Sequence, residues 1–182
     1  GFYPKGGGKL RIQIDPVPEL RRLDLMTRGD IIRTQATAIV SNLPRAIANR
    51  ELNVCRRKLS LKTNDLIIEE LDSKGPGNVI YLEVESERLT ELFVGFGEKR
   101  VKAETVADNV IKKCQRYLAA DDIPVGEHLA DQLLIPLALA GGRSFKTFPL
   151  SAHTTTNIHT IKKFLDVEIH VIEDSHSATL II

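Results

Sequence analysis

Three short apolar runs between residues 66 and 96, each about the length of a β-strand, constrain the fold more than any other feature of the chain. The runs are residues 66–71, 79–84 and 92–96, and the turn-forming sequence GPGN at 75–78 separates the first two. The following segment, 103–118, places Val106, Val110 and Cys114 at four-residue spacing, which is typical of an amphipathic helix. Strands followed by a helix predict a small sheet covered by helices, in a fold of the α/β or α+β class.

The rest of the chain shows the same mixture of patterns. Alternating or apolar segments predict strands at 9–14, in a segment ending near 28–29, and at 31–40, 145–148, 167–172 and 178–182, the last two as a hairpin-like pair. Helical spacing predicts helices at 44–59, 127–140 and 156–165. In the second of these, Leu129, Leu133 and Leu137 are the predicted buried stripe, and Gly141 and Gly142 are the predicted end.

Composition narrows the class of protein. The 182 residues are 42% hydrophobic and 27% charged, with a net charge of +1, so the chain as a whole has no basic field that announces a nucleic-acid-binding protein. No segment reaches the roughly 20 apolar residues of a membrane span. We predict a soluble, cytoplasmic protein without membrane partners, in which Cys55 and Cys114 are reduced thiols. The start, GFYPKGGG, lacks an initiator Met, and we expect that an upstream part is missing.

A cluster around His153, in the sequence LSAHTTTNI at 150–158, is the main candidate for chemistry. The predicted position just before a helix favours an anion such as phosphate, because backbone N–H groups and the helix dipole point towards it. Three Thr hydroxyls and Asn157 offer further donors, and a neutral imidazole there can attack phosphorus. The same residues also fit a capped helix with an ordinary loop histidine, and the pattern alone favours that interpretation.

A second polar cluster opens the helix predicted at 127–140. Spacings of three, four and seven residues place His128, Asp131, Gln132 and Ile135 on one face, where a ring, a carboxylate and an amide can hold a nucleotide. Acidic residues also belong in a first helical turn without any function, because they complement the helix dipole.

No residue is predicted to bind a metal. The remaining histidines lack the spacing of metal ligands, and the glycine run at 6–8 precedes a predicted strand and matches no phosphate-binding loop, so we interpret it as a tight connection.

Six blocks together resemble the RNA 3′-terminal phosphate cyclase family. They are GFYPKGGG at 1–8, LPRAIANREL at 43–52, KGPGNVIYLEVESE at 74–87, GEKRVKAE at 97–104, EHLADQLLIPLALA at 127–140 and AHTTTN at 152–157. The resemblance implies a ligase that uses ATP, with a divalent cation (Mg or Mn), to convert an RNA 3′-phosphate into a 2′,3′-cyclic phosphodiester in RNA processing. His153 matches the histidine that is adenylylated, and the ATP-binding segment matches His128, Leu129, Ala130, Asp131 and Gln132. His128 departs from the tyrosine of many relatives.

The resemblance also implies an architecture. It has repeated strand and helix units resembling the enolpyruvyl transferases, with residues 1–31 and 125–182 in a large cyclase domain and 32–124 as an inserted small α/β domain. The chain resembles the C-terminal half of such a protein, so the N-terminal half is an expected partner, together with RNA ending in a 3′-phosphate. We expect the fragment alone to be inactive, because half of a composite pocket rarely binds its ligand well. The alternative is a non-catalytic cyclase-like protein that acts in ribosome biogenesis by binding RNA or protein. That branch lacks the nucleophilic histidine, so His153 favours the enzyme.

Overall fold

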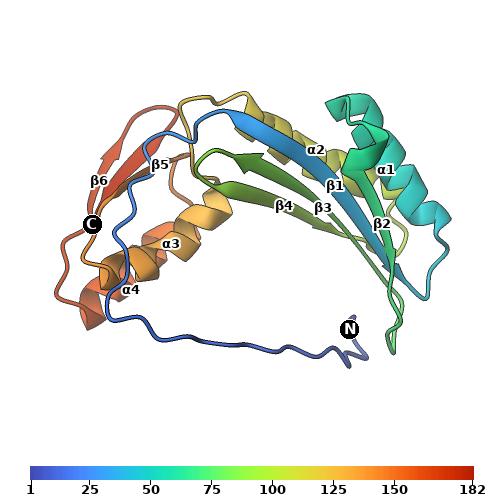
Figure 1. The fold of residues 1–182 in the computed structure, drawn as a ribbon, viewed down its shortest axis with the longest axis horizontal. Helices are drawn as coiled ribbons and strands as arrows, with labels where there is room; N and C mark the ends of the chain where they lie inside the picture. Colours follow the sequence, from blue (N-terminus) through green and yellow to red (C-terminus); the bar gives the residue numbers. More distant parts are fainter. The chain divides into compact units, whose positions relative to one another are not determined.

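The computed structural model describes residues 1–182 and divides into two compact units. The first, which we call the four-stranded unit, contains residues 1–13, 31–85 and 92–119; the second, the three-stranded unit, contains residues 14–30, 86–91 and 120–182. The two sheets and four α-helices confirm the α+β class (Figure 1). The division into a large cyclase domain and an insert at 32–124 stays a prediction. None of the helices is both long enough and apolar enough to cross a membrane.

The four-stranded unit is a sheet in the order β2-β1-β3-β4. Strand β1 (Ile31–Ser41) pairs in parallel with β2 (Leu66–Glu70), and helix α1 (Ala46–Leu59) and a short 3₁₀ helix (Thr63–Asp65) connect them. Strand β3 (Gly77–Ser86) alternates in burial, and β4 (Thr90–Phe96) forms one edge of the sheet, opposite β2. The predicted strands at 31–40, 66–71, 79–84 and 92–96 are therefore confirmed.

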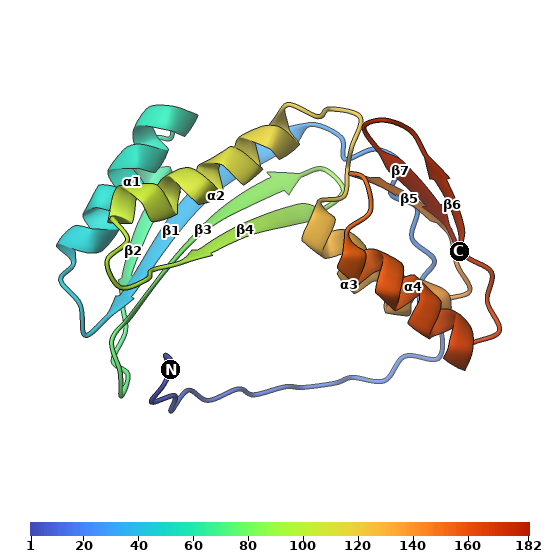
Figure 2. The same cartoon turned by 180° about the vertical axis from the view of Figure 1, so that it is seen from behind.

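Two helices cover one face of this sheet, as both views show (Figure 1, Figure 2). Helix α2 (Ala103–Leu118) has the predicted bounds and packs against α1. Cys55 and Cys114 lie buried on these two helices as free thiols, as predicted, and burial raises the pKa of each to about 12. Both therefore remain protonated at neutral pH.

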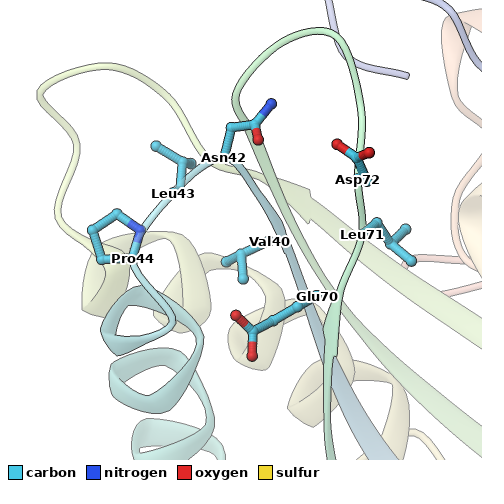
Figure 3. A pocket seen from close by; sticks show the side chains of 7 residues that line it. All are labelled: Val40, Asn42, Leu43, Pro44, Glu70, Leu71 and Asp72. Atoms are coloured by element: carbon cyan, nitrogen blue, oxygen red, sulfur yellow. The ribbon is translucent and has the colours of Figure 1, made fainter.

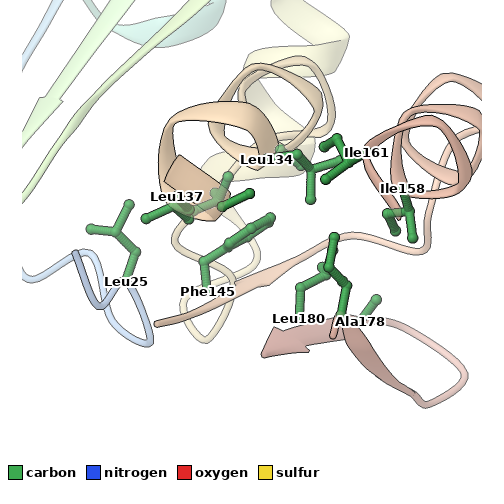
Figure 4. Packing of buried hydrophobic residues seen from close by; sticks show 12 residues of the cluster. Leu25, Leu134, Leu137, Phe145, Ile158, Ile161, Ala178 and Leu180 are labelled. Atoms are coloured by element: carbon green, nitrogen blue, oxygen red, sulfur yellow. The ribbon is translucent and has the colours of Figure 1, made fainter. Parts of the chain in front are cut away.

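The three-stranded unit is an antiparallel sheet in the order β5-β7-β6. It consists of β5 (Ser144–Thr147), β7 (Ala178–Ile181) and β6 (His170–Glu173), and the predicted hairpin is the β6–β7 pair. Helices α3 (Glu127–Leu139) and α4 (Ala152–Phe164) pack with the sheet around one apolar cluster (Figure 4). The side chains of Leu134, Phe145 and Leu180 at its centre are fully buried.

Two predicted strands are wrong. Residues 9–14 alternate as a strand should, yet they pair with no other strand, and Leu10, Ile12 and Ile14 are 84%, 70% and 80% exposed. The segment ending near 28–29 contributes only a single bridge, between Leu25 and Phe145. An alternating pattern forms a strand only when a neighbouring backbone accepts its hydrogen bonds, and sequence alternation does not supply that neighbour.

The predicted buried stripe of α3 is also partly wrong. Leu137 is buried, but Leu129 and Leu133 are only partly buried. The residues that face the core are Ala130, Leu134, Leu137 and Ala138. A helix with apolar residues on most sides has no unique buried stripe in its sequence, so the choice depends on the packing partner. The predicted end is confirmed, since Gly141 and Gly142 have positive φ and the N–H of Gly142 donates to the carbonyl of Leu137 at 2.9 Å.

Candidate active site

The start of helix α3 is held by a buried carboxylate. The N–H of Gly126, the N-cap residue, donates to Oε1 of Glu91, whose exposed fraction is only 4%. A Cβ added to Gly126 would lie 2.8 Å from Oε2 of Glu91, so a larger residue at this position would displace that carboxyl group. This hydrogen bond therefore fixes where α3 begins.

The predicted nucleotide segment occupies the first two turns of α3. His128 and Gln132 are exposed, and Asp131 between them is half-buried, so the predicted polar face is confirmed as a surface. Leu129 is partly buried and Ala130 is fully buried, so these two contribute packing and backbone instead of polar side chains. The structure thus presents an imidazole, a carboxylate and an amide on adjacent turns of one helix.

Helix α4 begins at Ala152, four residues before its predicted start at 156. Ser151 caps it, because its Oγ accepts from the N–H of Thr154 at 3.1 Å and its carbonyl accepts from the N–H of Thr155 at 3.0 Å. His153 therefore lies inside the first turn and not before it, and its side chain is exposed. The N–H groups of Ala152 and His153 precede the first intrahelical hydrogen bond, so they remain free to bind an anion.

The hydroxyls near His153 are less available than the sequence suggests. Thr154 is buried, and its Oγ1 lies 3.0 Å from Oγ of Ser151. Thr155 donates its hydroxyl to the carbonyl of Ser151 at 3.1 Å. Among the three threonines, only the hydroxyl of Thr156 makes no hydrogen bond within the protein. The expectation of three free donors is therefore wrong, because short hydroxyl side chains in a first turn bond to the nearby backbone.

A hydrogen-bonded link joins the two polar clusters. Nδ2 of Asn157 donates to both the carbonyl and Oδ1 of Asp131, each at 3.1 Å. Helices α3 and α4 lie side by side and run in the same direction (Figure 2). His153 lies one turn before Asn157, and His128 lies one turn before Asp131, on the same side of each helix as the linked residue. The structure therefore brings both predicted histidines to the same end of one helix pair.

The two residues that fix this arrangement, Glu91 and Ser151, were not among the predicted site residues. Ser151 has a local signal, because serine is a common N-cap residue whose hydroxyl oxygen accepts a hydrogen bond from the backbone N–H three residues later. Glu91 acts on a residue 35 positions away, and nothing in its sequence neighbourhood indicates that contact.

No group of three or more His, Cys, Asp or Glu side chains in residues 1–182 is arranged to hold a metal ion. The four-stranded unit has a concavity of about 500 Å³ where β1 and β2 end, lined by residues that include Asn42, Glu70 and Asp72 (Figure 3). Two carboxylates make it a poor place for phosphate, and it contains none of the predicted site residues.

Comparison with known sequences identifies the family of this chain. The model of a family described as RNA 3′-terminal phosphate cyclase matches residues 1–171. The chain belongs to that family. It is also similar to the RNA 3′-terminal phosphate cyclase of Koribacter versatilis (strain Ellin345), with 42% identity over 179 residues. The match covers 98% of this chain and 50% of that relative, so the chain spans about half of the relative's length. The resemblance stated from the sequence blocks is confirmed.

Proposed function

We propose that this chain carries the nucleotidyl-transfer residues of an RNA 3′-terminal phosphate cyclase that consumes ATP and forms 2′,3′-cyclic ends. The observation that supports it most is the placement of His153 in a cyclase-family chain. The imidazole is exposed within the first turn of α4, beside free backbone N–H groups. A nucleophile and donors for a phosphoryl oxygen at one helix end are what attack on phosphorus needs.

In the first step, an imidazole nitrogen of His153 attacks the α-phosphorus of ATP. A P–N bond forms, the P–O bond to the β-phosphate breaks, and pyrophosphate leaves. Charge that develops on the α-phosphoryl oxygens is stabilised by the N–H groups of Ala152 and His153 and by the positive end of the α4 dipole. The product is a phosphoramidate between the protein and AMP.

In the second step, an oxygen of the RNA 3′-phosphate attacks the same phosphorus and the protonated imidazole leaves with the electrons of the P–N bond. The 3′-phosphate now carries AMP as a good leaving group. The 2′-hydroxyl of the same ribose then attacks the 3′-phosphorus, loses its proton and expels AMP. The net reaction converts ATP to AMP and pyrophosphate and closes the cyclic phosphodiester.

We assign the first turns of α3 to the nucleotide. His128 offers a ring face to the base, and Gln132 offers an exposed amide to the base or ribose. Asp131 stays bonded to Asn157 and positions α3 against α4. We propose that the divalent cation, Mg²⁺ or Mn²⁺, arrives with the triphosphate, because such ions in nucleotide sites are held mainly by phosphates and by one or two carboxylates.

The test is covalent labelling with ATP that carries its label in the α-phosphate. We use the natural gene product that carries these residues, because the chain spans half of its relative and other residues are proposed to complete the pocket. Wild type is expected to retain label after denaturation, and His153→Ala is expected to retain none. The matched control is His159→Ala, which removes another exposed histidine of α4 and should label normally.

Equal labelling of wild type and His153→Ala would show that another residue is the nucleophile. Absence of label from wild type, with ATP and a divalent cation both present, would favour a non-catalytic member of the family.

A further inference from the structure

We propose that a concavity of the four-stranded unit binds single-stranded RNA, as a contact site for the RNA whose 3′ end is the substrate; this deepens the proposed function. The concavity has a volume of about 1070 Å³. Its walls come from the loop between β4 and α2, from the start of α1 and from the start of β3, with Tyr3 and Pro4 at its rim. It is as large as the largest small-molecule sites.

Three exposed cations lie in the β4–α2 loop that lines the concavity, and one of them, Lys102, helps to lower the pKa of Glu104. Lys99, Arg100 and Lys102 are exposed, and none of them makes an ion pair or hydrogen bond with an acidic side chain. Arg50 also lines the concavity, but both of its bonds go to Glu104, at 2.7 and 2.6 Å, so it is already neutralised. Cations spread over four consecutive positions suit successive phosphates of a nucleic-acid backbone.

Apart from the exposed carboxylate of Glu98, the remaining lining suits bases. Leu43, Ile47 and Val106 give apolar walls, and the ring of Tyr3 is 94% exposed, so flat bases can pack or stack there. An extended polyanion without flat apolar groups, such as an acidic peptide, would pair with the cations but leave the apolar walls exposed to water. The combination of cations with apolar and aromatic surface therefore favours single-stranded RNA over an acidic protein segment.

Hydrogen bonds hold the side chain of Asn78, which lines the concavity. Nδ2 of Asn78 donates to Oε2 of Glu51 at 2.9 Å and to the carbonyl of Ile39 at 3.2 Å, which fixes the amide and leaves its Oδ1 as an acceptor. A Cβ added to Gly97 would lie 2.4 Å from that oxygen, so the glycine keeps the loop close to Asn78.

Charge supports the same occupant. The four-stranded unit contains seventeen Lys and Arg against ten Asp and Glu, which gives a net charge of +7. Such a field attracts polyanions and raises their association rate.

The experiment measures fluorescence anisotropy of a labelled twelve-nucleotide RNA with a 3′-hydroxyl end, which cannot be cyclised, on the full 182-residue chain. The triple variant Lys99→Ala, Arg100→Ala, Lys102→Ala is expected to weaken binding at least tenfold at low salt. It should also reduce the slope of log affinity against log salt by about 2, because about three phosphate contacts are lost. The charge-matched control is Arg56→Ala, Arg57→Ala, Lys112→Ala, all exposed and outside the concavity, which should change the affinity less than threefold.

Equal weakening of RNA binding by the two triple variants would show that RNA is attracted only by the overall positive charge, and it would overturn the proposal. Absence of RNA binding by wild type would overturn it too. Displacement of the RNA by stoichiometric ATP would make the concavity a nucleotide site instead. The charge-conserving variant Lys99→Arg, Arg100→Lys, Lys102→Arg should bind RNA as wild type does. This variant separates the loss of charge from misfolding. The RNA probe needs no adenylylation, so loss of covalent labelling with intact RNA binding would reject the proposed function and leave this site standing.

Discussion

The two units of this chain have opposite charge. The four-stranded unit has a net charge of +7, whereas the three-stranded unit, with eight Lys and Arg against fourteen Asp and Glu, has a net charge of −6. The overall value of +1 conceals both. The net charge of the whole chain therefore does not indicate where a polyanion can bind.

This difference in net charge implies two different ways of binding an anion. The cationic unit attracts it with a broad field that salt screens. The acidic unit cannot do so, and the proposed nucleophile His153 must rely on short-range donors at a helix end, which act over the first turn only. Each interior also contains a buried carboxyl group, Glu51 in the four-stranded unit and Glu91 in the three-stranded unit, where the central cluster is apolar.

The largest expected effect is on the apolar core of the three-stranded unit. Phe145→Ala should lower the free energy of unfolding by about 3–5 kcal/mol, because it removes a fully buried ring from the middle of the cluster. Urea denaturation measures the change. Phe164→Ala is the control, since that ring is 82% exposed and its loss should change stability by less than about 0.5 kcal/mol. Similar values for the two would show that the cluster is not the core.

The interior of the four-stranded unit should instead respond to pH. Burial raises the pKa of Glu51 from 4.5 to about 7, and the hydrogen bond from Asn78 offsets only part of that rise. The folded protein therefore holds this proton more tightly than the unfolded chain. The stabilisation is complete below pH 4.5 and is lost as pH rises towards 7, by about 3 kcal/mol in total.

Glu51→Gln tests this dependence, because the amide cannot ionise. Urea unfolding at pH 5 and pH 8 should show that wild type loses more stability than the variant over this interval. Glu85→Gln, at an exposed position of β3, should behave as wild type. A wild-type loss equal to that of Glu51→Gln would mean that the carboxyl group ionises at its ordinary pKa.

A smaller effect is expected at the link between α3 and α4. Asn157→Ala removes both hydrogen bonds to Asp131, which should cost about 1 kcal/mol of stability and slow covalent labelling by about tenfold through misalignment of the helix pair. Single-turnover labelling and urea denaturation measure the two effects. Thr160→Ala, at an exposed position of the same helix, is the control. Lowered stability with an unchanged labelling rate would make Asn157 a purely structural residue.

The smallest effect is expected at Gln132. Its side chain is exposed, so Gln132→Ala should weaken ATP binding about fivefold, the value of one hydrogen bond, without changing the melting temperature. Ile135→Ala, one turn further along the same exposed face, should change neither. Calorimetric titration with ATP and thermal melts decide the matter. An unchanged ATP affinity with a lowered melting temperature would make Gln132 a packing residue.

Local patterns predicted a large part of the fold. Helix α2 has the predicted bounds, because four-residue spacing of buried apolar residues is a property of the helix itself. The strands from β1 to β4 were predicted from short apolar or alternating segments, which are likewise local patterns. The strand expected at 9–14 is absent, because its existence depends on a partner strand that no local pattern specifies.

The site was predictable to the same degree. Residue types and helical spacing gathered His128, Asp131 and Gln132 on one exposed face, and the family resemblance singled out His153. The link from Asp131 to Asn157 spans 26 positions, so sequence spacing does not reveal it. The earlier start of α4 follows from the Ser151 cap, which moved His153 from a loop into a first turn. Its assignment as the nucleophile stays a prediction.

Peptide mapping by mass spectrometry shows which residue of the protein accepts AMP from ATP. The natural gene product is incubated with ATP and a divalent cation, digested without acid to preserve a phosphoramidate, and analysed for peptides that carry AMP. AMP is expected on the peptide that contains His153, with fragment ions placing it on that imidazole. AMP on a lysine, or on His128 or His159 with His153 unmodified, would contradict it.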